Sequence, residues 1–166
     1  MSGMRILIVS DTHRRDGNFR RVLEKTGPID MLIHLGDTEG SEIYFKEWVN
    51  NDNCVIHVVR GNNDFFSRLD REKVVLIGGY TAFMTHGHRY GVNYGTDRLV
   101  EVAKENGASI AMYGHTHKPQ IELVDGVYVI NPGSISQPRQ EGRIPSYILM
   151  EIDRFDQVHF TLNFIE

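Results

Sequence analysis

The chain has 166 residues, of which 40% are hydrophobic and 24% are charged, and its formal net charge is −4. This composition is typical of one globular domain, which we expect to span residues 1–166, and the length allows a sizeable core without disulfides. The acidic balance argues against stable binding to nucleic acid or to a membrane, because both attract basic proteins. An anionic substrate would therefore need local positive charge.

Two further features set the expected compartment. The single cysteine, Cys54, cannot form an internal disulfide and is expected to lie in the core. No segment approaches the roughly 18 apolar residues of a membrane-spanning helix, and no signal-peptide pattern precedes the first strand. We therefore expect a cytoplasmic protein.

Strand-like and helix-like segments alternate in the first third of the chain. Buried strands are predicted where branched aliphatic residues run together, over residues 5–10, 31–35 and 54–59. Helices are predicted between them by apolar spacing, over residues 18–25 and over residues 41–49, with Ser41 as a cap. This order predicts a parallel sheet with right-handed crossovers, in which ligands bind beyond the carboxyl ends of the strands.

The rest of the chain predicts hairpins around one more helix. The paired apolar runs are 74–77 with 80–84, 120–124 with 127–130, and 146–152 with 157–165. A helix is expected from the capping pair Thr96 and Asp97 to a left-handed end at Asn106-Gly107, followed by a strand over residues 109–113. The part after this strand is expected to be antiparallel. Two sheets back to back with helices outside would use all these elements.

Polar side chains follow five of the predicted strands, at the point where each strand ends. They supply carboxylate, amide or imidazole ligands, and the set is Asp11, His13, Asp37, Asn62, His86, His115 and His117. The last two stand in Gly114-His115-Thr116-His117, where an extended backbone would point both imidazoles the same way, about 6–7 Å apart. This spacing suits one shared cation or two neighbouring ones, although His-x-His alone equally fits a hydrogen-bonded structural pair.

The ligand types indicate the kind of metal. Two metals about 3.5–4 Å apart need a bridging carboxylate and a few more oxygen and nitrogen ligands each, and this set meets that requirement. Imidazole and oxygen ligands without a thiolate favour manganese, iron, zinc, nickel or cobalt over calcium. We expect two divalent ions, with manganese as the first choice and magnesium as a further alternative.

Five motifs resemble, in order and spacing, those of the calcineurin-like metallophosphoesterases. They are Asp11-x-His13, Gly36-Asp37, Gly61-Asn62-Asn63-Asp64, the histidines His86 and His88 that flank Gly87, and Gly114-His115-Thr116-His117. The chain is similar to the small single-domain bacterial and archaeal phosphodiesterases of that superfamily, in which a sequence like Asn131-Pro132-Gly133-Ser134 is also common. The resemblance spans almost the whole chain. It implies a four-layer α/β/β/α sandwich, with two mixed sheets flanked by helices.

The resemblance also implies a role for each motif residue. The expected ligands are Asp11, His13 and His117 for the first metal, Asn62, His86 and His115 for the second, and Asp37 as the bridge. Asp37, Asn62 and His86 would carry the catalysis, with a metal-activated hydroxide attacking phosphorus in line. The implied reaction is hydrolysis of phosphodiester bonds in small or nucleotide-like substrates. Many members have histidine where this chain has Asn63, and an amide cannot protonate a leaving group.

Other interpretations stay open at this point. The alternative enzyme is a phosphomonoesterase, and the alternative to an enzyme is a metal-binding scaffold, because the chain also resembles the retromer subunit. Asp11, Asp37 and Asn62 are also typical turn residues. Three histidines are interpreted as structural, namely His34, His57 and His159. Phosphate contacts or a pocket wall could come from His88, Arg14, Arg15, Arg60, Phe65, Phe66, Tyr90 and Tyr94, and a homo-oligomer also stays open.

Overall fold

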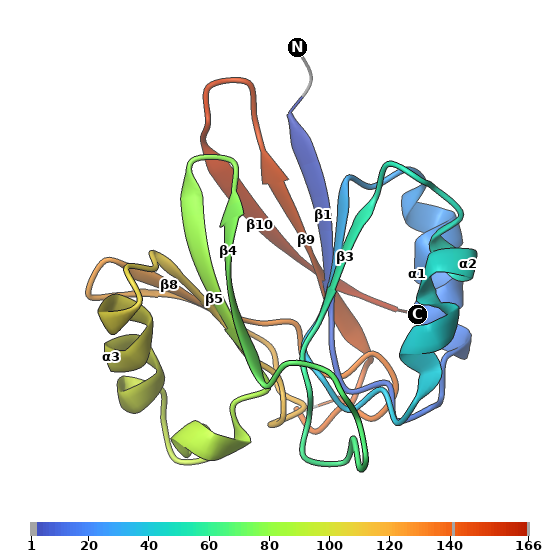
Figure 1. Ribbon diagram of the computed structural model, residues 1–166, viewed down its shortest axis with the longest axis horizontal. Helices are drawn as coiled ribbons and strands as arrows, with labels where there is room; N and C mark the ends of the chain where they lie inside the picture. Colours follow the sequence, from blue (N-terminus) through green and yellow to red (C-terminus); the bar gives the residue numbers. More distant parts are fainter. Residues whose placement is uncertain (1–2, 141, 166) are drawn as a thin grey trace.

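The computed structural model describes residues 3–140 and 142–165. These residues form two five-stranded sheets packed back to back, with α1 and α2 outside one sheet and α3 outside the other (Figure 1). The predicted four-layer α/β/β/α sandwich of two mixed sheets is therefore confirmed. No helix in the described part of the chain is long and apolar enough to cross a membrane.

The first sheet has the strand order β10–β9–β1–β2–β3. Its strands are β1 (Met4–Val9), β2 (Met31–His34), β3 (Val55–Val58), β9 (Ser146–Ile152) and β10 (Val158–Phe164). As predicted, β1, β2 and β3 run parallel, whereas β9 is antiparallel to both β1 and β10. The connections between the parallel strands carry α1 (Gly17–Thr26) and α2 (Phe45–Val49), which pack on the outer face of this sheet.

The second sheet has the strand order β4–β5–β6–β8–β7. Its strands are β4 (Glu72–Ile77), β5 (Tyr80–Thr85), β6 (Ile110–Met112), β7 (Gln120–Val124) and β8 (Val127–Asn131). The expected hairpins all form, and the strands after β6 pair with one another in antiparallel fashion as predicted, whereas β8 also pairs in parallel with β6, which the sequence did not predict. The chain leaves β6 for the sheet edge as β7, and the turn at Asp125-Gly126 then returns β8 alongside β6.

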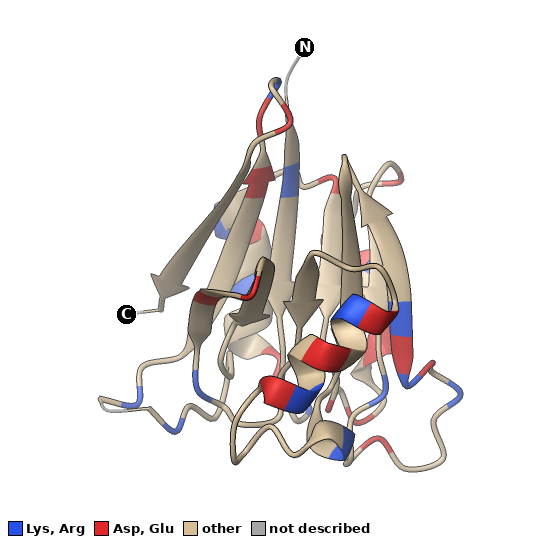
Figure 2. Cartoon of the chain, turned by 90° about the vertical axis from the view of Figure 1, so that its left-hand side faces the viewer, with Lys and Arg blue, Asp and Glu red and all other residues tan. Residues whose placement is uncertain are grey.

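Apolar side chains fill the three spaces between these four layers. Side chains alternate along a strand, so Ile6 and Ile8 of β1 face the second sheet while Leu7 and Val9 face α1. Both faces of this central strand are therefore buried, which explains its continuous apolar sequence. Helix α3 (Asp97–Glu105) covers the second sheet through buried Leu99. Acidic and basic residues lie next to one another along this helix (Figure 2).

The helix starts differ from the caps predicted. Ser41 begins a 3₁₀ turn, η1 (Ser41–Tyr44), ahead of α2, and its hydroxyl donates to Oδ2 of Asp16 (2.7 Å) instead of capping a helix. Thr96 does precede α3, but its side chain makes no capping hydrogen bond. At the other end, Gly107 has the predicted left-handed conformation, with φ of 69°, which lets the helix terminate there.

The histidines within strands have structural partners, as interpreted from the sequence. Buried His34 accepts a hydrogen bond from the N–H of Gly36, and burial lowers its pKa to about 4, so the ring is neutral at pH 7. His57 lies 2.8 Å from Nζ of Lys73, and exposed His159 pairs with Asp153. Cys54 differs from its prediction, because it lies half-buried at the edge of the core under α1 and α2.

Candidate metal centre

The seven predicted ligands lie at one end of the sandwich, where the parallel strands end. Asp11 and His13 follow β1, Asp37 follows β2, and His86 follows β5. Asn62 stands in the loop after β3, and His115 and His117 stand in the loop after β6. These loops gather at the lower end of the molecule in Figure 1. The carboxyl ends of parallel strands from both sheets therefore contribute to one cluster.

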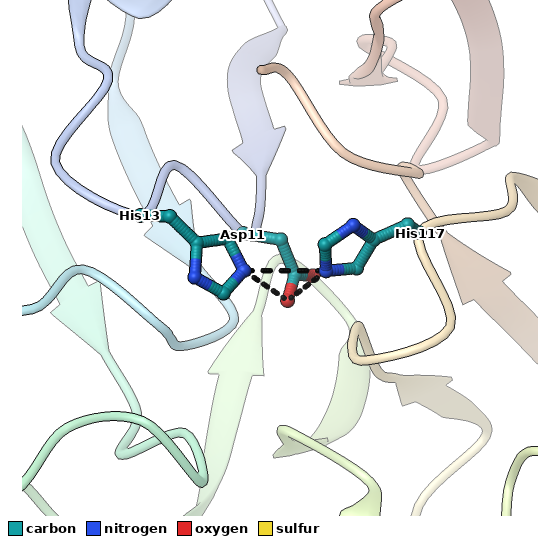
Figure 3. A group of neighbouring side chains, drawn as sticks. All are labelled: Asp11, His13 and His117. Carbon is teal, nitrogen blue, oxygen red and sulfur yellow. Dashed lines mark hydrogen bonds and ion pairs between the residues drawn. The ribbon is translucent and has the colours of Figure 1, made fainter. Parts of the chain in front are cut away.

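Asp11, His13 and His117 form the first group of ligand atoms (Figure 3). Oδ1 of Asp11 lies 3.3 Å from Nε2 of His117 and 3.8 Å from Nε2 of His13. The two imidazole nitrogens are themselves 3.2 Å apart. One cation placed among these atoms could contact all three residues, which is the set that the resemblance implies for the first metal.

Asp37 lies between this first group and His86. Its Oδ2 atom is 3.6 Å from Nε2 of His13 and 3.2 Å from Nε2 of His86. On the far side of His86, the ring of His115 is centred 5.1 Å away, and Nδ1 of His115 lies 3.1 Å from Oδ1 of Asn62. The second compact group of possible ligand atoms is formed by Asp11, Asp37 and His86, and the contacting pair of His115 and Asn62 lies next to His86.

Hydrogen bonds fix the orientation of the imidazole rings. Nδ1 of His86 lies 2.6 Å from the carbonyl oxygen of Leu35, and Nδ1 of His117 lies 2.6 Å from that of Gln137. Nδ1 of His13 lies 3.0 Å from Oε2 of Glu39. Because Nδ1 of each ring is held by an acceptor, Nε2 is directed to the centre, which is the orientation a metal ligand needs.

Five of the seven predicted ligands have a left-handed backbone. The φ angles lie between 48° and 70° at Asp11, His13, Asp37, His115 and His117. The extended conformation predicted for His115 and His117 is therefore wrong. The turn at each histidine directs His117 to the first group and His115 to Asn62. Such conformations cost about 1–3 kcal/mol each outside glycine and cluster at functional sites.

Glycines let the strand ends approach closely enough to form the cluster. A Cβ atom on Gly114 would lie 2.1 Å from Oγ of Ser10, and one on Gly61 would lie 2.1 Å from Oδ1 of Asp37. A side chain at either position would therefore displace a residue at the centre. The glycines of the Gly61-Asn62 and Gly114-His115 motifs are required by packing, independently of any metal.

Several residues that hold the ligands were not singled out from the sequence for this role. Buried Asp64 accepts hydrogen bonds from the backbone N–H groups of Asp37 (2.9 Å), Gly61 (2.7 Å) and Glu39 (2.7 Å). The hydroxyl of Ser134 donates to the carbonyl oxygen of Asp11 (2.9 Å). The motifs Gly61-Asn62-Asn63-Asp64 and Asn131-Pro132-Gly133-Ser134 were the available signal, but the contacts that give them this role are tertiary.

The electrostatics of the cluster fit a cation. Oδ1 of Asp11 and Nε2 of His86 are buried without a hydrogen-bond partner among the described residues, and they lie 3.7 Å apart. Burial would raise the pKa of Asp11 and Asp37, but the neighbouring His86 holds both pKa values below the usual range. Burial would lower the pKa of His86, but Asp11 and Asp37 raise it to about 9. Nearby positive charge therefore stabilises the two buried carboxylates, and a bound metal ion would supply such charge.

The other side chains considered for phosphate contact lie around this cluster. Partial burial and the nearby His86 lower the pKa of His88 to about 4, so this ring has no charge to offer phosphate at pH 7. Arg14 and Arg15 are exposed, and Arg60 is half-buried. Phe66 and Tyr94 are fully exposed, whereas the hydroxyl of Tyr90 donates to Glu72. Of the residues considered, Arg60, Phe65 and His88 line a hollow next to Asn62.

The sequence matches the Calcineurin-like phosphoesterase superfamily domain over residues 4–154. The chain belongs to this superfamily. It is 34% identical to Phosphodiesterase MJ0936 of Methanocaldococcus jannaschii over 147 residues, covering 78% of this chain and 83% of the relative. Its fold is similar to that of a predicted phosphoesterase from Streptococcus pneumoniae TIGR4, with a TM-score of 0.77, 28% identity and coverage of 99% of each chain.

A protein of another name is also similar to this chain. Vacuolar protein sorting-associated protein 29 of Schizosaccharomyces pombe is 27% identical over 162 residues, covering 90% of this chain and 85% of that protein. Proteins named for an enzymatic activity and a protein named for vacuolar sorting are thus both similar to this chain.

Proposed function

We propose that this superfamily member is a phosphodiesterase that hydrolyses small or nucleotide-like diesters. It would use two divalent ions, with manganese as the first choice of metal. The observation that carries the proposal is the position of Asp37, whose Oδ2 lies within 3.6 Å of Nε2 in both His13 and His86. One carboxylate between two ligand groups is the arrangement that a pair of metals needs. The proposal includes a single domain over residues 1–166, a cytoplasmic location and no stable binding to nucleic acid or membrane.

The residues of the centre divide into three roles. Asp11, His13 and His117 would hold one ion, Asn62, His86 and His115 the other, and Asp37 would contact both. Such ions, when bound, supply Lewis acidity toward phosphoryl oxygens and a lowered pKa for water. Asn62 offers a neutral oxygen, so it binds a cation without adding negative charge that would repel the phosphate. Asp37, Asn62 and His86 therefore stand where the phosphoryl group would bind.

A direct test compares esters that differ only in class. Aryl phosphodiesters and aryl phosphomonoesters with the same leaving group would be assayed with manganese, iron, zinc, nickel, cobalt and magnesium in turn. We expect diester hydrolysis that requires added metal, stops with chelator and exceeds monoester hydrolysis. Faster monoester hydrolysis would establish the phosphomonoesterase alternative. Absence of turnover with every metal, in protein that binds metal, would favour the scaffold that the similarity to Vacuolar protein sorting-associated protein 29 suggests.

Asn63 bears on how the leaving group departs. Its backbone N–H donates to Oδ1 of Asp37 (2.8 Å), and its side-chain Nδ2 donates to Oδ2 (3.1 Å). The residue thus orients the bridging carboxylate and has no acidic proton to deliver. Asp64 does not replace it, because its carboxylate accepts three backbone N–H groups. The leaving oxygen must then carry most of its negative charge as the bond to phosphorus breaks, because Asn63 cannot protonate it.

We therefore expect a steep dependence of the hydrolysis rate on the pKa of the leaving group. General acid catalysis is typically worth ~10²–10⁴-fold and matters most for poor leaving groups, so aryl diesters should react much faster than alkyl diesters. Asn63→His should raise the rate most for the alkyl diesters and flatten the dependence. The measurement is kcat/KM across a series of leaving groups for both proteins. A shallow slope in the parent, unchanged by the substitution, would mean that another group supplies the proton.

A further inference from the structure

A hollow of about 430 Å³ opens beside Asn62, next to the second ligand group. Its wall includes Arg60, Arg71 and Arg89 together with Phe65 and His88. We call it the arginine hollow. Asn62 is the one predicted metal ligand in its lining, so the hollow lies to one side of Asp11 and Asp37. A phosphoryl group held at Asp37 would leave the hollow free for another part of the same substrate.

The charge of the arginine hollow is unbalanced. Its lining contains three guanidinium groups and no carboxylate. In the part of the chain that the structure describes, none of the three forms an ion pair, whereas Arg98, Lys104 and other charged residues elsewhere do. Three arginines without an ion-pair partner thus line one hollow in a protein of net charge −4. Guanidinium groups bind phosphate oxygens through paired, charge-assisted hydrogen bonds, so this wall suits a phosphate.

The arginine hollow also offers an aromatic surface. The side chain of Phe65 is 72% exposed although it belongs to its lining. An exposed ring next to guanidinium groups suits a planar group that stacks while its phosphate is bound. The volume lies at the lower end of the range for small-molecule sites, about 300–1,000 Å³, which is sufficient for a nucleotide-sized group.

We propose that the arginine hollow binds a second phosphate group and an adjacent planar ring of the substrate. The substrate class is then a nucleotide-like diester that carries a further phosphate on one ester arm, with the scissile phosphate at Asp37. This inference rests on the proposed function for the identity of the scissile group. The binding of the second phosphate, however, depends on the three arginines and can be measured without turnover.

The test compares a dinucleotide that has one internal diester with the same dinucleotide phosphorylated at its 5′ or 3′ end. Binding would be measured by calorimetry in chelator, so that metal contacts and hydrolysis are absent. We expect one phosphorylated form to bind about tenfold more tightly than the unphosphorylated form. Arg71→Gln and Arg89→Gln should remove most of this difference between the phosphorylated and unphosphorylated forms, whereas Phe65→Ala should weaken binding of both forms and leave the difference in place.

The matched control is Arg154→Gln, which changes the net charge equally. Arg154 lies in the turn between β9 and β10, stacked on Phe155, at the opposite end of the molecule from the candidate centre (Figure 1). It should leave both affinities at the parent values. Equal binding of all three dinucleotides, no measurable binding of either phosphorylated form, or an equal effect of Arg154→Gln would overturn the proposal. With metal added, a parent that shows the binding preference but no turnover would contradict the proposed function alone.

Discussion

Replacing Asp37 with asparagine is expected to reduce metal-dependent diester hydrolysis to background while the fold is retained. Oδ2 of Asp37 lies between Nε2 atoms of His13 and His86, so the carboxylate would face two dications at once. A neutral amide is a poor bridging ligand, because the bridge needs negative charge. The substitution preserves size, and the backbone N–H of residue 37 can still donate to Asp64. The measurement is turnover of an aryl diester with manganese in excess.

A matched variant separates the bridge from the simple loss of a carboxylate. Asp125→Asn makes the same chemical change at an exposed position in the β7–β8 turn, where asparagine also tolerates the left-handed backbone. It should keep parent activity. Thermal unfolding of Asp37→Asn should remain cooperative, since only contacts at the cluster change. If Asp37→Asn retained activity within a few-fold of the parent, Asp37 would not belong to the centre.

Replacing either His115 or His117 with alanine should remove about one metal ion per chain and abolish most of the activity. The structure places His117 beside Asp11 and His13, whereas His115 contacts Asn62 next to His86. Each imidazole would therefore serve a different ion, and both ions are needed to position and activate the phosphoryl group. Elemental analysis and turnover of the same reconstituted samples provide the measurement.

His159→Ala is the control for these two substitutions. This exposed imidazole pairs with Asp153 on the opposite end of the first sheet, so its loss should change neither metal content nor turnover. Retention of two tightly bound ions by either His115→Ala or His117→Ala would remove that histidine from the ligand set. Loss of both ions from each variant would indicate that the two sites bind metal cooperatively.

The sandwich could be predicted because its strands and turns form where their own sequences favour them. The apolar run of β1 predicts a strand buried on both faces, and Asp125-Gly126 predicts the turn that forms. The parallel pairing of β8 with β6 could not be predicted in this way, because it depends on where the β7–β8 hairpin docks. Ser41 likewise bonds to Asp16, a partner from another segment, instead of to its own helix.

The candidate centre was predictable in composition but not in conformation. Ligand types at strand ends, together with the resemblance, identify the residues that the structure brings together. The left-handed turns at His115 and His117 could not be inferred, since these residues are held by tertiary contacts, from the N–H of His115 to Asp11 and from the ring of His117 to the carbonyl oxygen of Gln137. Arg71 and Arg89 carry no local signal either, because only tertiary packing places them with Arg60 around one hollow.

The number of metal ions per chain tests the binuclear centre most directly. The parent protein would be stripped with chelator, reconstituted with manganese, freed of unbound metal and analysed for metal and protein content. Asp37 between two ligand groups, and the unpartnered Oδ1 of Asp11 and Nε2 of His86, predict two ions per chain. A content of no more than one ion per chain after reconstitution would contradict the binuclear centre.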